Sequence, residues 1–88
     1  MSYQVHLSRR CQKFLGKIEV RDKDRIIDKL KKLSENPHPS DSKFITRQEG
    51  DKVFRIRIGY FRALYIVIES REIVLVTKID KRPRIYNR

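Results

Sequence analysis

The sequence predicts an α+β fold in which an antiparallel sheet packs one face against two N-terminal helices. Apolar residues recur with a helical period between residues 11 and 33, and they alternate with polar residues in the second half of the chain. Two prolines at positions 37 and 39 separate these halves. The predicted order is strand, helix, helix, strand, strand, strand, and 88 residues suffice for one domain, residues 1–88.

The N-terminal segments are a short strand and a helix. Apolar and polar residues alternate over Tyr3–Leu7, which predicts the strand. Ser8 is a suitable N-cap for the helix that follows, because its hydroxyl can accept a hydrogen bond from a free backbone N–H. The apolar face of this helix has the spacing i, i+3, i+4 and i+7, and it consists of Cys11, Phe14, Leu15 and Ile18.

A second helix follows, with Asp22 as its predicted cap and Asp24 adding negative charge to its first turn. It ends before Pro37, because a residue that precedes proline disfavours the helical conformation. The segment from Asn36 to Asp41 is therefore expected to be a loop. The apolar face of this helix consists of Ile26, Ile27, Leu30 and Leu33.

The second half of the chain predicts three strands joined by tight turns. Alternation over Val53–Ile58 and Phe61–Ile68 predicts a hairpin, with Gly59 and Tyr60 as a two-residue turn in which glycine supplies the positive φ. A third strand, Glu72–Ile79, follows another short turn. With this turn, Arg57 faces Arg62. The helix-facing side of the hairpin then carries Phe54, Ile56, Ile58, Phe61, Ala63 and Tyr65.

The opposite side of this hairpin carries Arg55, Arg57, Arg62, Leu64 and Ile66. Two arginines directly across from each other repel, and an anion bound between them would remove the repulsion. The alternative is that both guanidinium groups point apart into water. Two apolar residues beside this charge, which the helices cannot cover, suggest a protein partner as well.

The chain is strongly basic, with 22 Lys and Arg against 11 Asp and Glu, a net charge of +11. Residues 52–88 hold 10 basic and 3 acidic side chains, so the positive charge concentrates there. Such an excess of one sign favours a surface that binds an anionic partner. A surface that is charged only for solubility usually carries both positive and negative side chains. No apolar run or leader segment indicates a membrane or secretion, and a lone cysteine, Cys11, excludes an internal disulfide. A cytoplasmic protein is expected.

Few residue types are available for chemistry on a nucleic acid. A metal route would need clustered carboxylates or histidines, and the basic half offers only three scattered acids. The two histidines fall on a predicted strand and a predicted loop. Arginines and a tyrosine remain: Arg82 and Arg84 precede Tyr86 closely enough for their charge to favour its phenolate. A packing role for this tyrosine is the alternative.

Two segments resemble a known family. The stretch FRIRIGYFRALY, residues 54–65, resembles the signature of the RelE/ParE toxin superfamily, and KRPRIY, residues 81–86, resembles the C-terminal motif of its RelE branch. The resemblance implies a RelE-like fold and a type II toxin that cleaves mRNA in the ribosomal A site. It implies no metal or cofactor, because the ribose 2′-OH attacks the adjacent phosphate. The implied partners are an antitoxin, the ribosome and mRNA, and no membrane.

The resemblance also implies roles for single residues. Arg62 would hold the scissile phosphate, Arg82 would stabilise the transition state, and Tyr86 would act as general base or stack on a base. Pro83 stands where a second arginine is frequent, and Arg84 would take over its role. The expected catalytic set is therefore Arg62, Arg82, Arg84 and Tyr86. The expected RNA-binding residues are Arg55, Arg57, Lys78 and Lys81.

Lys81 stands where several members of the family carry a histidine, so a histidine base is missing there. Two other functions stay open at this point. One is inhibition of DNA gyrase, as in the ParE branch, which lacks the nuclease residues. The other is a non-catalytic RNA-binding module, which would bind RNA in a salt-sensitive way without arresting growth.

Overall fold

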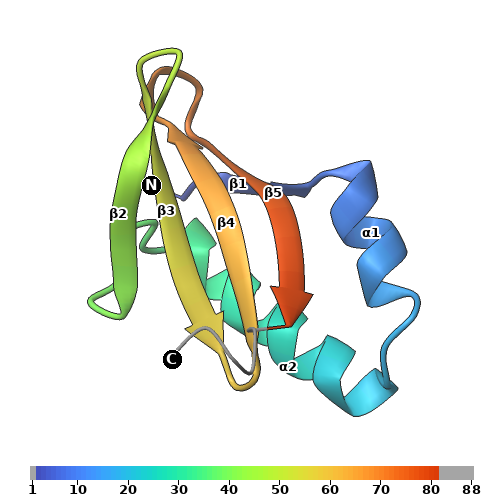
Figure 1. Ribbon diagram of the computed structural model, residues 1–88. Helices are drawn as coiled ribbons and strands as arrows, with labels where there is room; N and C mark the ends of the chain where they lie inside the picture. The colour runs from blue at the N-terminus through green and yellow to red at the C-terminus, as the bar shows by residue number, and fades with distance from the viewer. Residues whose placement is uncertain (1, 82–88) are drawn as a thin grey trace, which may run out of the picture.

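The computed structural model describes residues 2–81, in which one five-stranded sheet is covered on one face by helices (Figure 1). The helices are α1 (Arg9–Leu15) and α2 (Val20–Lys31), and a 3-10 turn, η1 (Lys32–Ser34), extends α2. The strands are β1 (Gln4–Leu7), β2 (Ser42–Gln48), β3 (Asp51–Ile58), β4 (Phe61–Ile68) and β5 (Ile73–Lys81), with a second 3-10 turn, η2 (Glu69–Arg71), between β4 and β5. The α+β class is confirmed.

The sheet differs from the expectation in two ways. Its strand order is β1-β5-β4-β3-β2, and β2 is a strand that the sequence did not predict. The pairing of β1 with β5 is parallel, so the sheet is mixed, not wholly antiparallel. Tight turns force β3, β4 and β5 to alternate in direction, whereas the long connection through two helices leaves the direction of β1 free.

The hairpin of β3 and β4 has the predicted register. Arg57 pairs with Arg62, and Ile58 pairs with Phe61 next to the turn. Gly59 has φ of 62°, as a turn with glycine in its first position requires. A Cβ at this position would also lie 3.0 Å from Nη1 of Arg25 on α2, so the turn and the helix approach closely.

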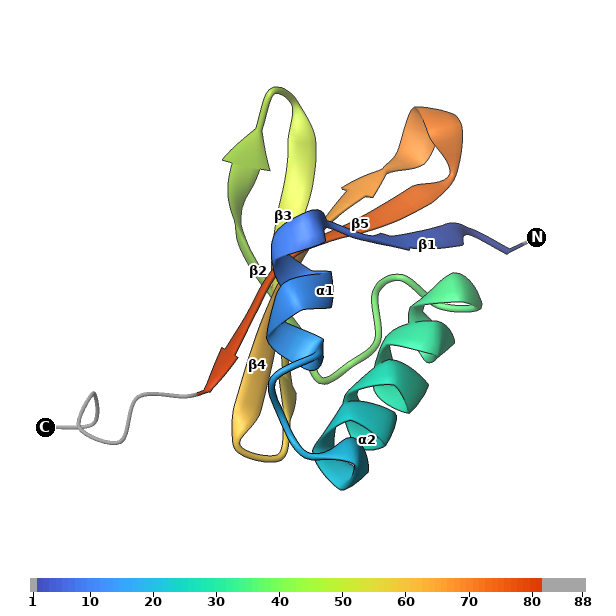
Figure 2. The same cartoon turned by 90° about the vertical axis from the view of Figure 1, so that its right-hand side faces the viewer.

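The core lies between the helices and the sheet, and it contains every residue predicted for the helix-facing side of the hairpin. Figure 2 shows α1 and α2 at the same side of the β3–β4 hairpin. Tyr65 is fully buried, and its hydroxyl donates a hydrogen bond to the carbonyl of Pro37, 2.9 Å away. The buried cluster comprises Cys11, Leu15, Ile26, Leu30, Leu33, Phe54, Ile56, Ile58, Phe61, Ala63, Tyr65, Val67, Val74, Val76 and Ile79.

The two helices begin differently. The Ser8 cap is confirmed, since its Oγ accepts a hydrogen bond from the backbone N–H of Cys11. The Asp22 cap is wrong: α2 begins at Val20, and Glu19 before it makes no side-chain cap. Asp22 lies instead in the first turn, where its charge still complements the helix dipole. None of the helices within residues 2–81 is both long and apolar enough to cross a membrane.

Candidate functional site

The face of the sheet that points away from the helices carries a group of basic side chains, which we call the basic sheet face. It consists of Arg55 and Arg57 on β3, Arg62 on β4 and Lys78 on β5. Side chains alternate along a strand, so the core residues between these positions leave them all on the outer side. The three strands thereby collect four predicted site residues on one surface.

Asp80 is the acidic member of this surface. Its Oδ1 lies 3.1 Å from Nε of Arg62, and its Oδ2 lies 3.6 Å from Nζ of Lys78. Register explains the contact, because Asp80 on β5 is the direct neighbour of Arg62 on β4. The side chains of Arg62 and Asp80 are 32% and 31% exposed, so an incoming ligand can reach both.

This pair changes the interpretation of the two facing arginines. The register of Arg57 and Arg62 is as predicted, but the chain supplies a carboxylate of its own on the other side of Arg62. In the sequence, Asp80 is one of only three scattered acids in the basic half of the chain. The alternation of β5, continued to its last residues, places Asp80 on the same face as Lys78, but only the register of β4 with β5 sets it beside Arg62.

A hollow of about 220 Å³ lies on the basic sheet face. Its lining comprises Ile45, Arg55, Arg62, Leu64, Lys78 and Asp80. Two guanidinium groups and an ammonium group around one small space suit the oxygen atoms of a phosphate. Arg57 lies next to this hollow through its pairing with Arg62 but does not line it.

Lys81, the last predicted site residue among residues 2–81, does not line this hollow. Lys81 pairs with Phe61, so the alternation of β5 assigns it to the helix-facing side of the sheet. The other three, Arg82, Arg84 and Tyr86, lie outside the described residues. Their roles stay predictions.

The apolar residues of the outer face are less exposed than expected. Ile66 is only 7% exposed, because its cross-strand neighbours Val53 and Leu75 flank it on both sides. Leu64 is half-buried. Ile45 lies on β2, a strand that was not predicted; it is 45% exposed and lines the hollow beside Leu64. The exposed apolar surface therefore lies beside β2, whereas it was expected at Leu64 and Ile66 on β4.

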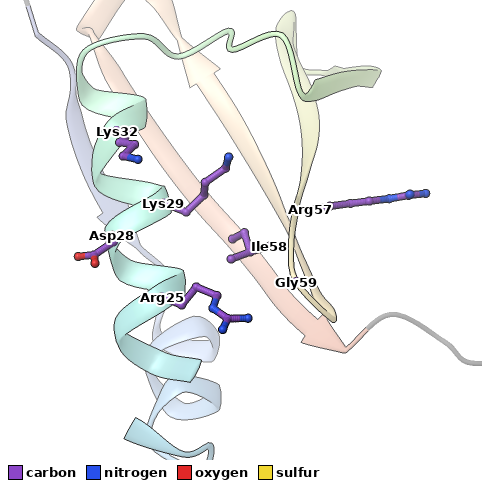
Figure 3. A pocket seen from close by; sticks show the side chains of 7 residues that line it. All are labelled: Arg25, Asp28, Lys29, Lys32, Arg57, Ile58 and Gly59. Atoms are coloured by element: carbon purple, nitrogen blue, oxygen red, sulfur yellow. The ribbon is translucent and has the colours of Figure 1, made fainter. Parts of the chain in front are cut away.

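A second hollow, of about 440 Å³, lies between α2 and the end of the β3–β4 hairpin (Figure 3). Arg25 and Lys29 extend from α2 toward the hairpin, whereas Arg57 points away from the helix, and Asp28 also points away from the hollow. Nζ of Lys29 is 2.6 Å from Oδ2 of Asp41, and this contact lowers the pKa of that carboxyl. Part of the positive charge here is therefore already paired.

Metal ligation would need clustered carboxylate, histidine or cysteine side chains. Between residues 2 and 81, no three histidine, cysteine or carboxylate side chains are grouped in a way that could hold a metal ion. The charged groups that the hollow on the basic sheet face does contain are cations and one carboxylate.

Comparison with known protein families and curated proteins gives consistent matches. Residues 13–84 match the family model described as Phage derived protein Gp49-like (DUF891). A protein of Methanocaldococcus jannaschii named "Putative toxin RelE1" is 31% identical over 87 residues, which cover 98% of this chain and 97% of that protein. An Escherichia coli protein named "Putative RelE-like toxin protein" is 32% identical, covering 99% of this chain and 93% of that one.

Solved structures share the fold. The archaeal RelE–RelB complex from Pyrococcus horikoshii superposes with a TM-score of 0.86 at 22% identity, covering 96% of this chain and 99% of that chain. The RelBE2 toxin–antitoxin complex of Mycobacterium tuberculosis gives 0.78 at 23% identity, with 93% and 100% covered. The isolated E. coli RelE toxin gives 0.76 at 21% identity, with 98% and 90% covered. The predicted RelE-like fold is thus confirmed.

Proposed function

The chain belongs to the RelE family of toxins, and from this premise we propose that it is a ribosome-dependent endoribonuclease of a type II toxin–antitoxin pair. The observation that carries the proposal is the hollow on the basic sheet face, where Arg55, Arg62 and Lys78 surround a space that fits a phosphate. A nuclease of this kind needs cations at the scissile phosphate more than any other group.

The proposed reaction needs no metal. The ribose 2′-OH attacks the adjacent phosphorus, the bond from phosphorus to the 5′-oxygen breaks, and the products carry a 2′,3′-cyclic phosphate and a 5′-hydroxyl. One proton leaves the 2′-OH and one reaches the departing 5′-oxygen. Arg62 stabilises the extra negative charge that the phosphate gains in between.

The resemblance assigns the remaining roles to residues beyond the end of β5. Tyr86 would take the proton of the 2′-OH, and Arg82 would add positive charge in the transition state. Arg84 would support both. Arginine has a pKa above about 12, which makes charge stabilisation a better role than proton donation for these side chains.

An antitoxin is the proposed protein partner. The similar P. horikoshii structure is a RelE–RelB complex, and the similar M. tuberculosis structure is a toxin–antitoxin complex. A net charge of +11 favours an acidic partner segment for this chain. Ile45 and Leu64 beside the basic sheet face offer an apolar contact for it. Such a segment would cover the hollow and thereby silence the toxin.

The test is cleavage of mRNA on stalled ribosomes, mapped by primer extension. We expect cleavage in the A-site codon by the wild-type protein and none by Arg82→Ala. Free mRNA without ribosomes should stay intact. Intact mRNA at equal amounts of toxin and ribosome would contradict the proposal. Gyrase-linked DNA breaks on expression would then point to the ParE branch, and salt-sensitive RNA binding without growth arrest would point to a binding module.

A further inference from the structure

A second basic surface lies on α1, away from the hollow that contains Arg62. Four basic residues of α1 and the turn after it surround, together with Lys78, a hollow of about 590 Å³, which we call the α1 hollow. Phe14 and Ile79 supply its apolar surface. The basic residues of its lining are Arg9, Arg10, Lys13, Lys17 and Lys78.

The charge of this surface is not compensated. The first acidic residue of the chain is Glu19, so α1 and the turn that follows it contain no carboxylate side chain. Among residues 2–81, no ion pair involves any of the four basic residues that α1 and its turn contribute. In α2, by contrast, acidic and basic residues alternate.

The α1 hollow is built on a fixed frame. β1 pairs with β5 only as far as Val76, and beyond this point α1 lies beside the strand (Figure 1). The Oγ of Ser8 donates a hydrogen bond to the carbonyl of Thr77, 3.2 Å away. Nε and Nη2 of Arg10 donate to the same carbonyl, at 3.4 and 3.3 Å. These contacts hold the helix at the strand, so its charges need little ordering when a ligand binds.

Lys78 connects the two basic surfaces. Its side chain lines the α1 hollow and also the hollow that contains Arg62. It is balanced in part by Asp80, with Nζ and Oδ2 3.6 Å apart. An extended polyanion could therefore pass from one surface to the other along the edge of β5.

We propose that the α1 hollow binds the phosphate backbone of RNA at a position separate from the cleavage site. Arg9 and Lys13 are one helical turn apart, so they present charges in a row. Lysine is depleted at protein–protein interfaces, whereas nucleic-acid interfaces are strongly positive, which favours RNA over an acidic protein. The choice of RNA over other polyanions rests on the proposed function.

The test compares two variants that each lose three positive charges. Arg9→Gln/Lys13→Gln/Lys17→Gln changes the α1 hollow, and Arg21→Gln/Lys23→Gln/Lys31→Gln changes exposed positions of α2. The probe is a short single-stranded RNA that is 2′-O-methylated at every position, so that it cannot be cleaved. Binding is followed by fluorescence anisotropy over a series of KCl concentrations, and circular dichroism verifies the fold of each variant.

Each phosphate contact to a single strand contributes about 0.7 to the slope of log affinity against log salt. Loss of three contacts should therefore reduce the slope by about 2 in the α1 variant. The α2 variant should retain the wild-type slope, as should Arg9→Lys/Lys13→Arg/Lys17→Arg, which keeps every charge. Equal losses in the α1 and α2 variants would overturn the proposal, because net charge alone would then explain the binding.

Two further measurements distinguish RNA binding by the α1 hollow from binding of an acidic protein and from the nuclease function. Unchanged RNA binding by the α1 variant, together with weaker binding to poly-L-glutamate, would assign the hollow to an acidic protein and overturn the proposal. Cleavage on ribosomes is measured separately. If the wild-type protein cuts no mRNA but the α1 slope falls as expected, the proposed function fails while the RNA-binding surface stands.

Discussion

The guanidinium of Arg62 and the carboxylate of Asp80 form an ion pair between β4 and β5, with Nε and Oδ1 3.1 Å apart. The same carboxylate also lies near Lys78, so one acid partly neutralises two cations of the proposed phosphate site. A phosphate that binds there competes with Asp80 for Arg62. In the free protein, this acid also relieves the repulsion between Arg57 and Arg62 that the hairpin register imposes.

Asp80→Asn should strengthen RNA binding, because it removes the internal competitor of the phosphate. Partly exposed ion pairs are worth up to about 1 kcal/mol, so the gain should be at most about fivefold. Affinity for the 2′-O-methylated RNA measures it. Asp28→Asn on α2 makes the same charge change outside the basic sheet face and should have less effect. A gain no larger than that of Asp28→Asn would contradict the role of Asp80.

Arg62→Ala should reduce cleavage of ribosome-bound mRNA by about 100-fold or more, the usual cost of losing one group that stabilises a transition state. Arg62→Lys should restore only part of the rate, because lysine lacks the planar fork of donors. Single-turnover rates measure both. Arg71→Ala, in the turn at the other end of β4, is the matched control and should cut like the wild type.

Ser8→Ala should lower the free energy of unfolding by about 1 kcal/mol, the usual cost of removing a helix N-cap. Ser8 accepts a hydrogen bond from Cys11 and donates one to Thr77, so the substitution affects both α1 and its attachment to β5. Urea unfolding followed by circular dichroism measures the loss. Ser70→Ala, at an exposed position, should change stability little, and an equal effect of the two variants would contradict this assignment.

Tyr65→Phe should cost about 1 kcal/mol at neutral pH, since the carbonyl of Pro37 loses its donor. Tyr60→Phe, at a residue that is 80% exposed, is the control and should cost almost nothing. Urea unfolding at neutral pH measures both.

The effect of Tyr65→Phe on stability should also depend on pH in the alkaline range. Burial raises the pKa of Tyr65 above its ordinary value of 10.0. The neutral phenol is therefore favoured in the folded state, and its contribution is complete below pH 10.0 and lost as pH rises through the folded pKa. The deficit of Tyr65→Phe relative to the wild type should shrink above that pH. A deficit that is constant with pH would contradict the assignment.

Patterns of local spacing predicted the helices, the hairpin and its register, because each depends on residues close together in the sequence. β2 was not predicted because all but one of its residues are exposed, so its sequence has no alternating buried face. In addition, a bulge between Phe44 and Thr46 interrupts its pairing with β3, so apolar and polar residues do not alternate. The parallel pairing of β1 with β5 joins residues such as Val5 and Val74, which no local pattern connects.

The candidate site was predictable in part for the same reason. Hairpin spacing predicted that Arg55, Arg57 and Arg62 share one face, and Lys78 was among the expected RNA-binding residues. The contact of Asp80 with Arg62 required the register of β4 with β5. A bulge at Leu64 and Tyr65 shifts that register, and this shift cannot be inferred from alternation alone.

The most direct measurement is the cleavage of an mRNA that carries a single 2′-deoxynucleotide on the 5′ side of the scissile bond, bound in the A site of stalled ribosomes. We expect that the unmodified mRNA is cut to give a 5′-hydroxyl and a 2′,3′-cyclic phosphate, and that the deoxy-substituted mRNA stays intact. Cleavage of the substituted mRNA at the same bond, or products with a 5′-phosphate, would contradict attack by the 2′-OH at a phosphate held by Arg62.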